Sequence, residues 1–269
     1  MAALHDGLGG LNYRAFDTSA RYRAFKAAVA VDHQLAADRA KNRPVALVTE
    51  IVSGAQWLIY GDAVSPADAD LLNDVVSQAR AALTDDRSAT FDVEGKSYFI
   101  QVHNPPLRLY IVGAVHITQA LAQMASIAGY AVTVIDPRRA FAEPERFPGI
   151  SVSNGWPDDV LAAAMPDRRT AIITLSHDPK IDDPALEMVL RSDVFYIGSL
   201  GSKRTHGKRL ARLDEKGFSA AETGRIHGPV GLDIGAKSPA EIAISIMAEI
   251  TQARRSSRQS ATTKDRGAA

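Results

Sequence analysis

Five stretches in the second half of the chain combine small residues with polar or charged ones, a composition typical of loops that bind phosphate-bearing small molecules. They cover residues 112–118, 136–139, 176–180, 198–209 and 227–236. The first four follow short apolar runs that predict β-strands, at 109–112, 131–135, 171–175 and 194–197. In an open parallel sheet, ligands bind beyond the carboxyl ends of the strands, so these stretches are the candidate binding loops.

The first stretch has the layout of a dinucleotide phosphate loop, because a strand, Gly113 and the start of a helix follow one another. Its fingerprint is incomplete, since Val115 and Thr118 stand where the second and third glycines belong. A β-branched side chain at Val115 obstructs the approach of a pyrophosphate, although the amides at the helix start still favour a phosphate. Gly113, Ala114 and His116 are the candidate contacts, and a plain strand-to-helix turn is the alternative.

The second stretch places an acid and a cation after the next strand. Asp136 follows Gly113 by about twenty residues, where a carboxylate accepts hydrogen bonds from a ribose diol. The same carboxylate could equally bind the edge of an aminopyrimidine or a pterin, and Arg138 would supply an anion contact. Alternatively, Asp136 only caps the turn.

The third stretch contains Ser176, His177 and Asp178. A histidine beside an aspartate could act as an acid or base, or as a proton-bearing contact to a ligand. The alternative is a loop histidine that is bonded to its neighbours. Too few ligands converge here to predict a metal site, and no nucleophile is evident, so we predict neither metal-binding nor catalytic residues.

The fourth stretch is the densest in small residues and cations: Gly198, Ser199, Ser202, Lys203 and Arg204. Small residues allow close approach of the backbone, and Ser202 is expected to cap the helix that follows. Lys203 and Arg204 oppose the dipole at the start of that helix, so a bound anion is the simplest compensation. A solvated basic face is the alternative.

The fifth stretch contains Gly231 and Asp233 among three glycines and a proline. Such a loop is shaped to close over the carboxyl edge of the sheet, and a long structural connector is the alternative. It leads into a helix that opens with the capping box Ser238-Pro239-Ala240-Glu241.

The composition narrows the classes of function. The 31 basic and 31 acidic residues balance, which argues against a dedicated nucleic-acid binder. No apolar run approaches the ~20 residues of a membrane span, and the N-terminus lacks the layout of a signal peptide. The chain has no cysteine, which excludes disulfides, thiolate metal sites and a persulfide carried on this chain. We therefore expect a cytoplasmic protein without a membrane span.

The order of the expected elements changes at Asn104-Pro105-Pro106, which we interpret as a domain boundary. Residues 1–104 are predicted to form a smaller α+β domain, with helices over 20–41 and from Ser65-Pro66 onward and hairpins at 45–60 and 89–103. Residues 105–254 alternate strands with helices that begin near residues 117, 157, 184, 202 and 239, which predicts an α/β fold with a Rossmann-like parallel sheet. The polar residues 255–269 are predicted to be a disordered tail.

The later loops carry a family resemblance. The segments VIDPRRAFAEPERFPG, TLSHDPKIDDPAL, YIGSLGSKRTHGKRLARL and RIHGPVGLDIGAKSPAEIAISIMAEI resemble the XdhC/CoxI family of xanthine dehydrogenase and carbon monoxide dehydrogenase accessory proteins. The resemblance covers about residues 96–254 and implies binding of molybdenum cofactor (molybdopterin), its protection during sulfuration and its delivery to the apoenzyme of a molybdenum hydroxylase. It also implies a cysteine desulfurase as a partner and a homodimer.

Two departures from the family pattern bear on this role. The family's N-terminal domain usually carries a glycine- and serine-rich stretch that ends Gly-Gly-Cys-Glu, and residues 45–62 have neither that stretch nor a cysteine. That domain is therefore abbreviated or divergent, and sulfur would reach the cofactor directly from the desulfurase. Val115 stands where the family often has glycine, which weakens cofactor binding at the first loop.

Three functions follow as hypotheses. The preferred one is a non-catalytic carrier of molybdenum cofactor. The weaker alternative is an NAD(P)-dependent oxidoreductase, for which Asp136 favours NAD while Arg138 and Arg139 blur the choice. The third is a degenerate scaffold that binds only the target enzyme.

Overall fold

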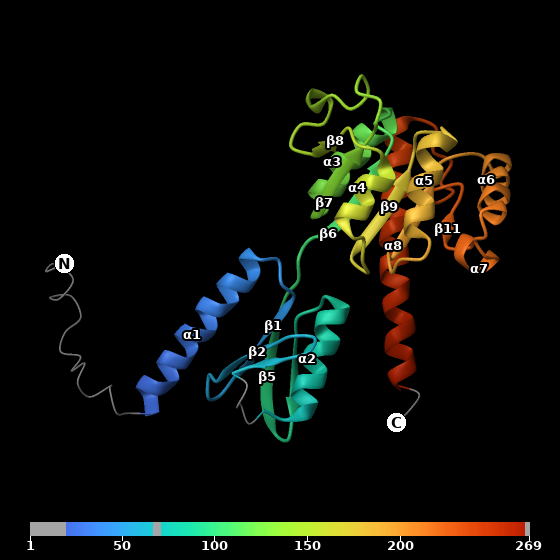
Figure 1. Cartoon of the computed structure of the whole chain (residues 1–269). Coiled ribbons are helices and arrows are strands. Elements are labelled where there is room, and N and C mark those ends of the chain that lie inside the picture. The colour runs from blue at the N-terminus through green and yellow to red at the C-terminus, as the bar shows by residue number, and fades with distance from the viewer. Residues whose placement is uncertain (1–19, 67–70, 267–269) are drawn as a thin grey trace, which may run out of the picture. The chain divides into compact units, whose positions relative to one another are not determined.

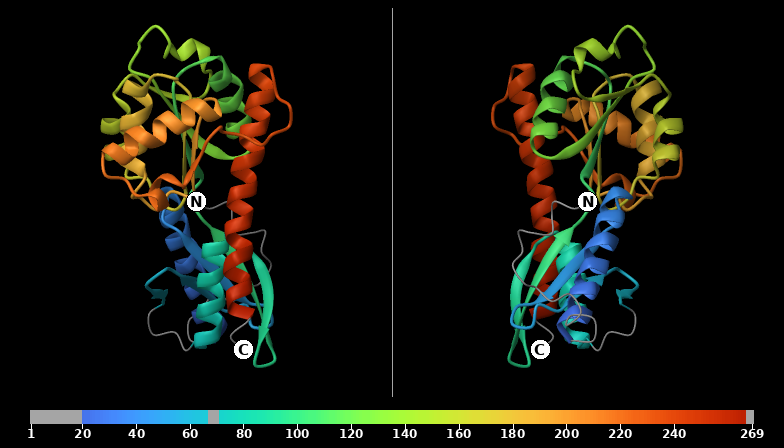
Figure 2. Two further views of the ribbon diagram at one scale, coloured as in Figure 1. Left: turned by 90° about the vertical axis from the view of Figure 1, so that its right-hand side faces the viewer. Right: turned by 90° about the vertical axis from the view of Figure 1, so that its left-hand side faces the viewer.

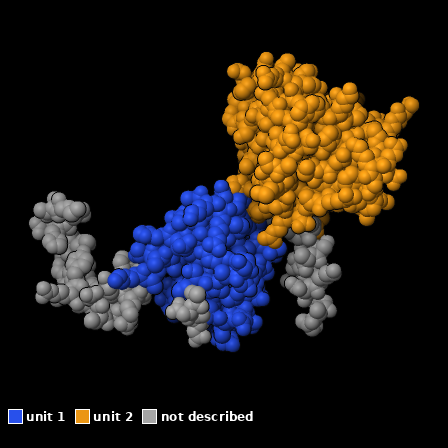
Figure 3. Space-filling view, viewed as in Figure 1, with its two compact units in different colours: residues 1–105 blue, residues 106–269 orange. Residues whose placement is uncertain are grey.

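The computed structural model describes residues 20–66 and 71–266, with the backbone alone for 20–25 and 257–266. Contacts divide the chain into two compact units, Met1–Pro105 and Pro106–Ala269, which are coloured separately in Figure 3. Within the described residues, no helix combines the length and the apolar composition that crossing a membrane requires.

The first unit is an antiparallel sheet with the strand order β3-β2-β1-β5-β4 (Figure 1). Helix α1 buries Val31 and Leu35 with Val45 and Leu47 of the sheet, whereas α2 packs with the alternate strand residues such as Ala46. Successive side chains of a strand point to opposite faces, so this sheet has a helix on each face. The elements are α1 (Ala20–Ala40), β1 (Val45–Glu50), β2 (Gln56–Ile59), β3 (Val64–Ser65), α2 (Asn73–Asp85), β4 (Ala89–Val93) and β5 (Lys96–His103).

The start of α2 differs from the prediction. The sequence predicted that Ser65-Pro66 opens this helix, but α2 begins at Asn73 and Ser65 lies in β3. Val64 and Ser65 pair with Ile59 and Leu58, so their backbone groups are used in the sheet rather than at a helix start. Ala67 and Asp68, the rest of the predicted capping segment, lie outside the described residues. The two hairpins and the first helix are confirmed.

The second unit is a six-stranded parallel sheet with the order β11-β10-β9-β6-β7-β8, which confirms the predicted α/β class. Figure 2 shows α3 beside α8 on one side of this sheet and the helices from α4 to α6 on the other. The elements are β6 (Leu107–Val112), α3 (His116–Ile127), β7 (Tyr130–Ile135), η2 (Pro144–Arg146), β8 (Ser151–Ser153), α4 (Pro157–Ala164), β9 (Thr170–Thr174), α5 (Pro179–Val189), β10 (Tyr196–Ser199), α6 (Lys203–Glu215), α7 (Ala220–Thr223), β11 (Ile226–His227) and α8 (Pro239–Arg266).

The strand order reverses between β6 and β9, the two central strands. From β6 the chain moves outward to β7 and β8, and from β9 it moves outward in the other direction to β10 and β11. Such a reversal is the switch point at which open α/β sheets bind their ligands. The Leu175 amide donates to the Val112 carbonyl at 2.7 Å, so the loops after β6 and β9 start side by side.

Several elements of this unit depart from the sequence prediction. Helix α5 begins at Pro179 rather than near Pro184, because Asp178 caps it by accepting from the Lys180 amide, and Pro184 lies inside the helix. The short α7 and β11 were not predicted. Helix α8 continues to Arg266 through residues predicted as a disordered tail, since extending an existing helix avoids the cost of nucleation.

The close packing of the two central loops generates a prediction about Gly113. Its φ is +106°, and a Cβ atom there would lie 2.6 Å from the Ser176 amide nitrogen. We expect Gly113→Ala to lower the free energy of unfolding by about 2–4 kcal/mol, measured by urea denaturation. Gly207→Ala is the control: its added methyl meets open space on α6, so it should leave stability equal or raise it by up to about 1 kcal/mol. Equal urea midpoints for Gly113→Ala and the wild type would contradict the packing described.

Candidate functional site

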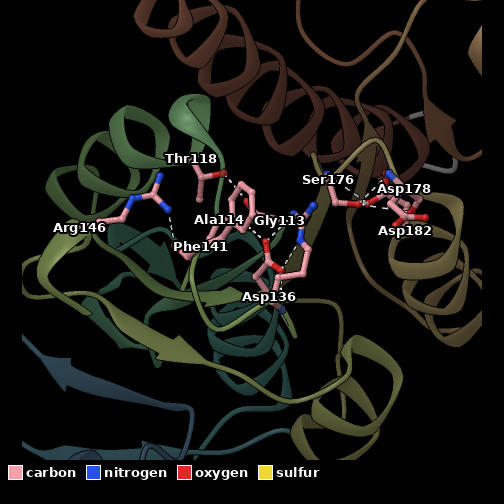
Figure 4. A network of polar contacts seen from close by, with 10 residues as sticks. Gly113, Ala114, Thr118, Asp136, Phe141, Arg146, Ser176, Asp178 and Asp182 are labelled. Carbon is pink, nitrogen blue, oxygen red and sulfur yellow. Dashed lines mark hydrogen bonds and ion pairs between the residues drawn. The ribbon is translucent and has the colours of Figure 1, made fainter. Parts of the chain in front are cut away.

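Asp136, at the carboxyl end of β7, is the centre of a buried polar cluster (Figure 4). Its Oδ2 accepts from the Ala114 amide at 2.8 Å and from Arg138 Nη2 at 2.7 Å. Its Oδ1 accepts from the Arg138 amide at 3.0 Å and from Arg138 Nε at 2.9 Å. The carboxylate thus joins the loops after β6 and β7 and fixes the Arg138 guanidinium with two parallel bonds.

The protonation state of Asp136 follows from these bonds. Burial by itself raises the pKa of this carboxyl, but the hydrogen bonds from Arg138 and from the Ala114 amide outweigh burial, so the net pKa is lowered. Asp136 is therefore an anion with both oxygens engaged by the protein. Its predicted contact to a ribose or a pterin stays a prediction, and such a contact has to compete with Arg138.

In the loop after β6, the amides of the first two residues are already bonded within the protein. Gly113 and Ala114 are buried; the Gly113 amide donates to the Ile135 carbonyl at 2.8 Å, and the Ala114 amide donates to Asp136. The Thr118 hydroxyl donates to the Gly113 carbonyl. Val115 is the N-cap of α3 without a side-chain cap bond, and His116 is exposed at the first helical position. A ligand can therefore reach the start of α3, but not the amides of Gly113 and Ala114.

The loop after β9 is also organised by a buried carboxylate. The Ser176 hydroxyl donates to Asp182 Oδ1 at 2.6 Å and accepts from the Asp178 amide at 3.1 Å. His177, between them, has a φ of +62°, a left-handed conformation that is uncommon for histidine. Its side chain is exposed, so this turn presents the imidazole at the carboxyl edge of the sheet.

Asp182 differs from Asp136 in its electrostatics. It is buried on α5, and burial raises its pKa to about 6, although the bonds from Ser176 act in the opposite direction. The neighbouring Asp183 is bonded by Arg212 of α6 at 2.6 and 2.9 Å, so that guanidinium is not available to Asp182. A buried carboxyl without a directly bonded cation favours its neutral form.

The loop after β10 places two cations at the surface. The Ser199 hydroxyl is buried and bonded to the Thr174 hydroxyl of β9, while Gly198 leaves room for Val230, whose methyl would lie 2.6 Å from an added Cβ. Ser202 caps α6 as predicted by accepting from the Thr205 amide at 3.1 Å. Lys203 and Arg204, the first two residues of α6, are exposed.

The loop between β11 and α8 is held by Glu249, a residue that the sequence prediction missed. Glu249 accepts from the Gly231 amide at 2.7 Å and from the Tyr196 hydroxyl at 2.5 Å, and it lies 3.1 Å from His227 Nδ1. Burial raises the pKa of the Tyr196 hydroxyl, and the Glu249 carboxylate raises it further. The predicted capping box of α8 is confirmed. Asp233 is exposed in this loop, and within the described residues no hydrogen bond or ion pair joins its side chain to the other candidates.

The sheet thus gathers most of the predicted site residues at one edge. The backbone of Gly113 lies close to that of Ser176. Asp178 and Asp182 attract the Arg138 guanidinium through space. The Ser199 hydroxyl is bonded to Thr174 at the end of β9. Glu249 and Asp182 were not predicted as site residues. The partners of Glu249 are distant in sequence, whereas Asp182 meets Ser176 through the turn that opens α5. Within the described residues, no group of three or more His, Asp or Glu side chains could hold a metal ion.

Comparisons with known proteins show which family, curated proteins and solved structure this chain resembles. A family model described as the XdhC Rossmann domain matches residues 109–250. The protein YqeB of Escherichia coli, which has no assigned role, is 36% identical over 156 residues, and the molybdenum cofactor insertion chaperone PaoD of the same organism is 35% identical over 150 residues. These matches cover 58% and 56% of the chain, which spans only 29% and 41% of the two relatives. The crystal structure of a xanthine dehydrogenase from Bacillus halodurans matches with a TM-score of 0.65 and 25% identity, over 83% of this chain and 66% of that one.

The raised pKa of Asp182 predicts a specific dependence of stability on pH. A carboxyl with a pKa of about 6 in the folded state and 3.8 when unfolded stabilises the fold fully below pH 3.8 and loses that contribution as the pH rises through 6. We expect the wild type to lose up to about 3 kcal/mol relative to Asp182→Asn between pH 4 and 7, measured by urea unfolding at several pH values. Asn keeps an oxygen that accepts from Ser176. Asp233→Asn, at an exposed position, is the control and should follow the wild type. Parallel curves for Asp182→Asn and the wild type would be the contrary result.

Proposed function

The chain belongs to the XdhC family, and from this membership we propose that it binds molybdenum cofactor and delivers it, during or after sulfuration, to a molybdenum hydroxylase of the xanthine dehydrogenase or carbon monoxide dehydrogenase type. In this role the protein is a carrier rather than an enzyme. The observation that carries the proposal is the similarity to a molybdenum cofactor insertion chaperone over 150 residues.

The site has the chemistry that such a cargo needs. Molybdopterin carries a phosphate and a hydrogen-bonding pterin. The loops at the carboxyl edge of the sheet carry an exposed imidazole at His177, the guanidinium of Arg138 and the exposed cations Lys203 and Arg204, which supports the proposal. We propose that the phosphate binds at the start of α3 or at residues 199–204, and that the loops after β7 and β9 contact the heterocycle.

The proposed partners follow from the same role. They are the apoenzyme of a molybdenum hydroxylase and a cysteine desulfurase, and we propose that the protein acts as a homodimer in the cytoplasm. Because the chain has no cysteine, it cannot hold a persulfide, and sulfur would pass from the desulfurase to the bound cofactor without a carrier residue on this protein.

An NAD(P)-dependent oxidoreductase is the second candidate, and the strand order supports it, since it is that of a dinucleotide-binding sheet. Two details disfavour it. Val115 occupies the position of the second glycine, and Asp136, the expected ribose acceptor, already binds Arg138 and the Ala114 amide. Anaerobic titrations with isolated molybdenum cofactor and with NAD(P)H separate the two functions: we expect selective, micromolar binding of the cofactor, and selective binding of the nucleotide would overturn the proposal.

A double variant tests whether Lys203 and Arg204 contribute to binding of molybdenum cofactor. Lys203→Ala combined with Arg204→Ala removes both exposed cations from the start of α6, and we expect it to raise the Kd for molybdenum cofactor by at least about tenfold, measured by anaerobic titration. Arg87→Ala combined with Lys96→Ala is the matched control, because it removes the same net charge from exposed positions in the first unit. Equal affinities for the two double variants would show that these cations are not at the site.

A further inference from the structure

The start of α6 has more unused hydrogen-bond donors than the start of α3. In the described part of the chain, no acceptor bonds the backbone amides of residues 201–204, whereas the Thr205 and His206 amides are bonded to Ser202. Gly201 has a φ of +144°, which suits glycine. Consecutive free amides at a helix start form a site for an anion.

The corresponding loop before α3 is used by the protein itself. The Gly113 amide is bonded to Ile135, the Ala114 amide is bonded to Asp136, and the Thr118 amide is bonded to Val115. Among the described residues, no acceptor bonds the amides of Val115, His116 and Ile117, so three donors are left at that helix start, next to the Val115 side chain. A phosphate there would meet three donors, one fewer than at α6, and Arg138, the cation of the neighbouring loop, is already paired with Asp136.

The charges around α6 also favour an anion. Lys203 and Arg204 are its first two residues, and its first turn contains no acidic residue. Two cations at this end oppose the helix dipole, which is unfavourable unless a negative charge lies between them and the amides.

Arg209 provides an independent indication. Its side chain is 2% exposed, and it lies beneath the same loop: Nη2 donates to the Leu200 carbonyl at 2.8 Å and lies 3.8 Å from where a Cβ of Gly201 would be. Among the described residues, its Nε has no hydrogen-bond partner. The nearby carboxyls do not bond it, because Asp183 binds Arg212 and Asp182 binds Ser176. Nη1 lies 3.4 Å from His206 Nδ1, and Asp182 and Asp183 act on the guanidinium only through space. A buried guanidinium without a bonded carboxylate would gain from an anion on the loop above it.

We propose that the phosphate group of the ligand binds at the start of α6, on the amides of residues 201–204 between Lys203, Arg204 and the buried Arg209, and not at the glycine loop after β6. This assignment rests on the proposed function, because molybdenum cofactor is the phosphate monoester that it concerns. It makes the loop after β10 the phosphate subsite and leaves the loops after β7 and β9 for the rest of the molecule.

Proline substitution tests the amides apart from the charges. Lys203 is the first residue of α6, where proline is tolerated, and the extended backbone of Ser202 (φ −74°, ψ 165°) suits a residue before proline. Lys203→Ala removes the cation, whereas Lys203→Pro removes the cation and the amide donor. We expect Lys203→Pro to bind isolated molybdenum cofactor about tenfold more weakly than Lys203→Ala. Millimolar inorganic phosphate should compete with the cofactor in the wild type and lose that effect in Lys203→Pro.

The same pair of variants at α3 is the control. His116 is the first residue of α3 and also follows an extended residue, so His116→Pro should bind the cofactor as His116→Ala does. Urea midpoints of all four variants show that they remain folded. A proline effect at His116 and none at Lys203 would place the phosphate at the glycine loop and overturn the assignment, as would the absence of a proline effect at either helix.

The failure of this assignment is distinguishable from the failure of the proposed function. If the wild type binds molybdenum cofactor but is insensitive to Lys203→Pro, the subsite is wrong and the carrier role stands. If the wild type does not bind the cofactor at all, the carrier role fails, and with it the assignment.

Discussion

The arrangement of the site depends on the reversal of strand order between β6 and β9. These neighbouring strands send the chain outward in opposite directions, and the loops that follow them have to share one narrow space. Gly113 meets that constraint, because no side chain fits between its backbone and that of Ser176. Once the two central loops are packed, the loops after β7 and β10 are placed on either side of them. The carboxyl edge therefore presents polar groups from four strands within one region.

Two buried carboxylates stabilise this edge in different ways. Asp136 is fully engaged by Arg138 and by a backbone amide, so it remains charged and ties the loops after β6 and β7 together. Among the described residues, Asp182 is hydrogen-bonded to Ser176 alone, and Arg209 acts on it through space without a bond, so its charge is poorly compensated. The two parts of this edge therefore differ. Near β6 and β7, most polar groups are bonded to one another. Near the start of α6, backbone amides and two cations have no acceptor among the described residues. Ligand binding is expected where the protein has not satisfied its own groups.

The sequence predicted the fold of the second unit well because its elements carry local signals. Alternating apolar runs, the Ser202 cap and the capping box before α8 each involve residues within four positions of one another. The start of α2 was wrong because pairing of β3 with β2 overrides a favourable cap at Ser65, and Pro184 was a misleading signal because Asp178 starts α5 earlier. The candidate loops were found from the positions of glycine and charge. Glu249 was missed because its partners Tyr196 and Gly231 are distant in sequence. Asp182 and Arg209 were not named because their burial cannot be inferred from their positions on amphipathic helices.

The carrier role is the central claim, and transfer of the cargo tests it most directly. The measurement is the activity recovered by an apo molybdenum hydroxylase of the xanthine dehydrogenase type, mixed anaerobically with this protein preloaded with sulfurated molybdenum cofactor, against an equal amount of free cofactor. If the protein is a carrier, recovery is faster and more complete from the loaded protein. Recovery no greater than that from free cofactor, although the protein was loaded, would contradict this role.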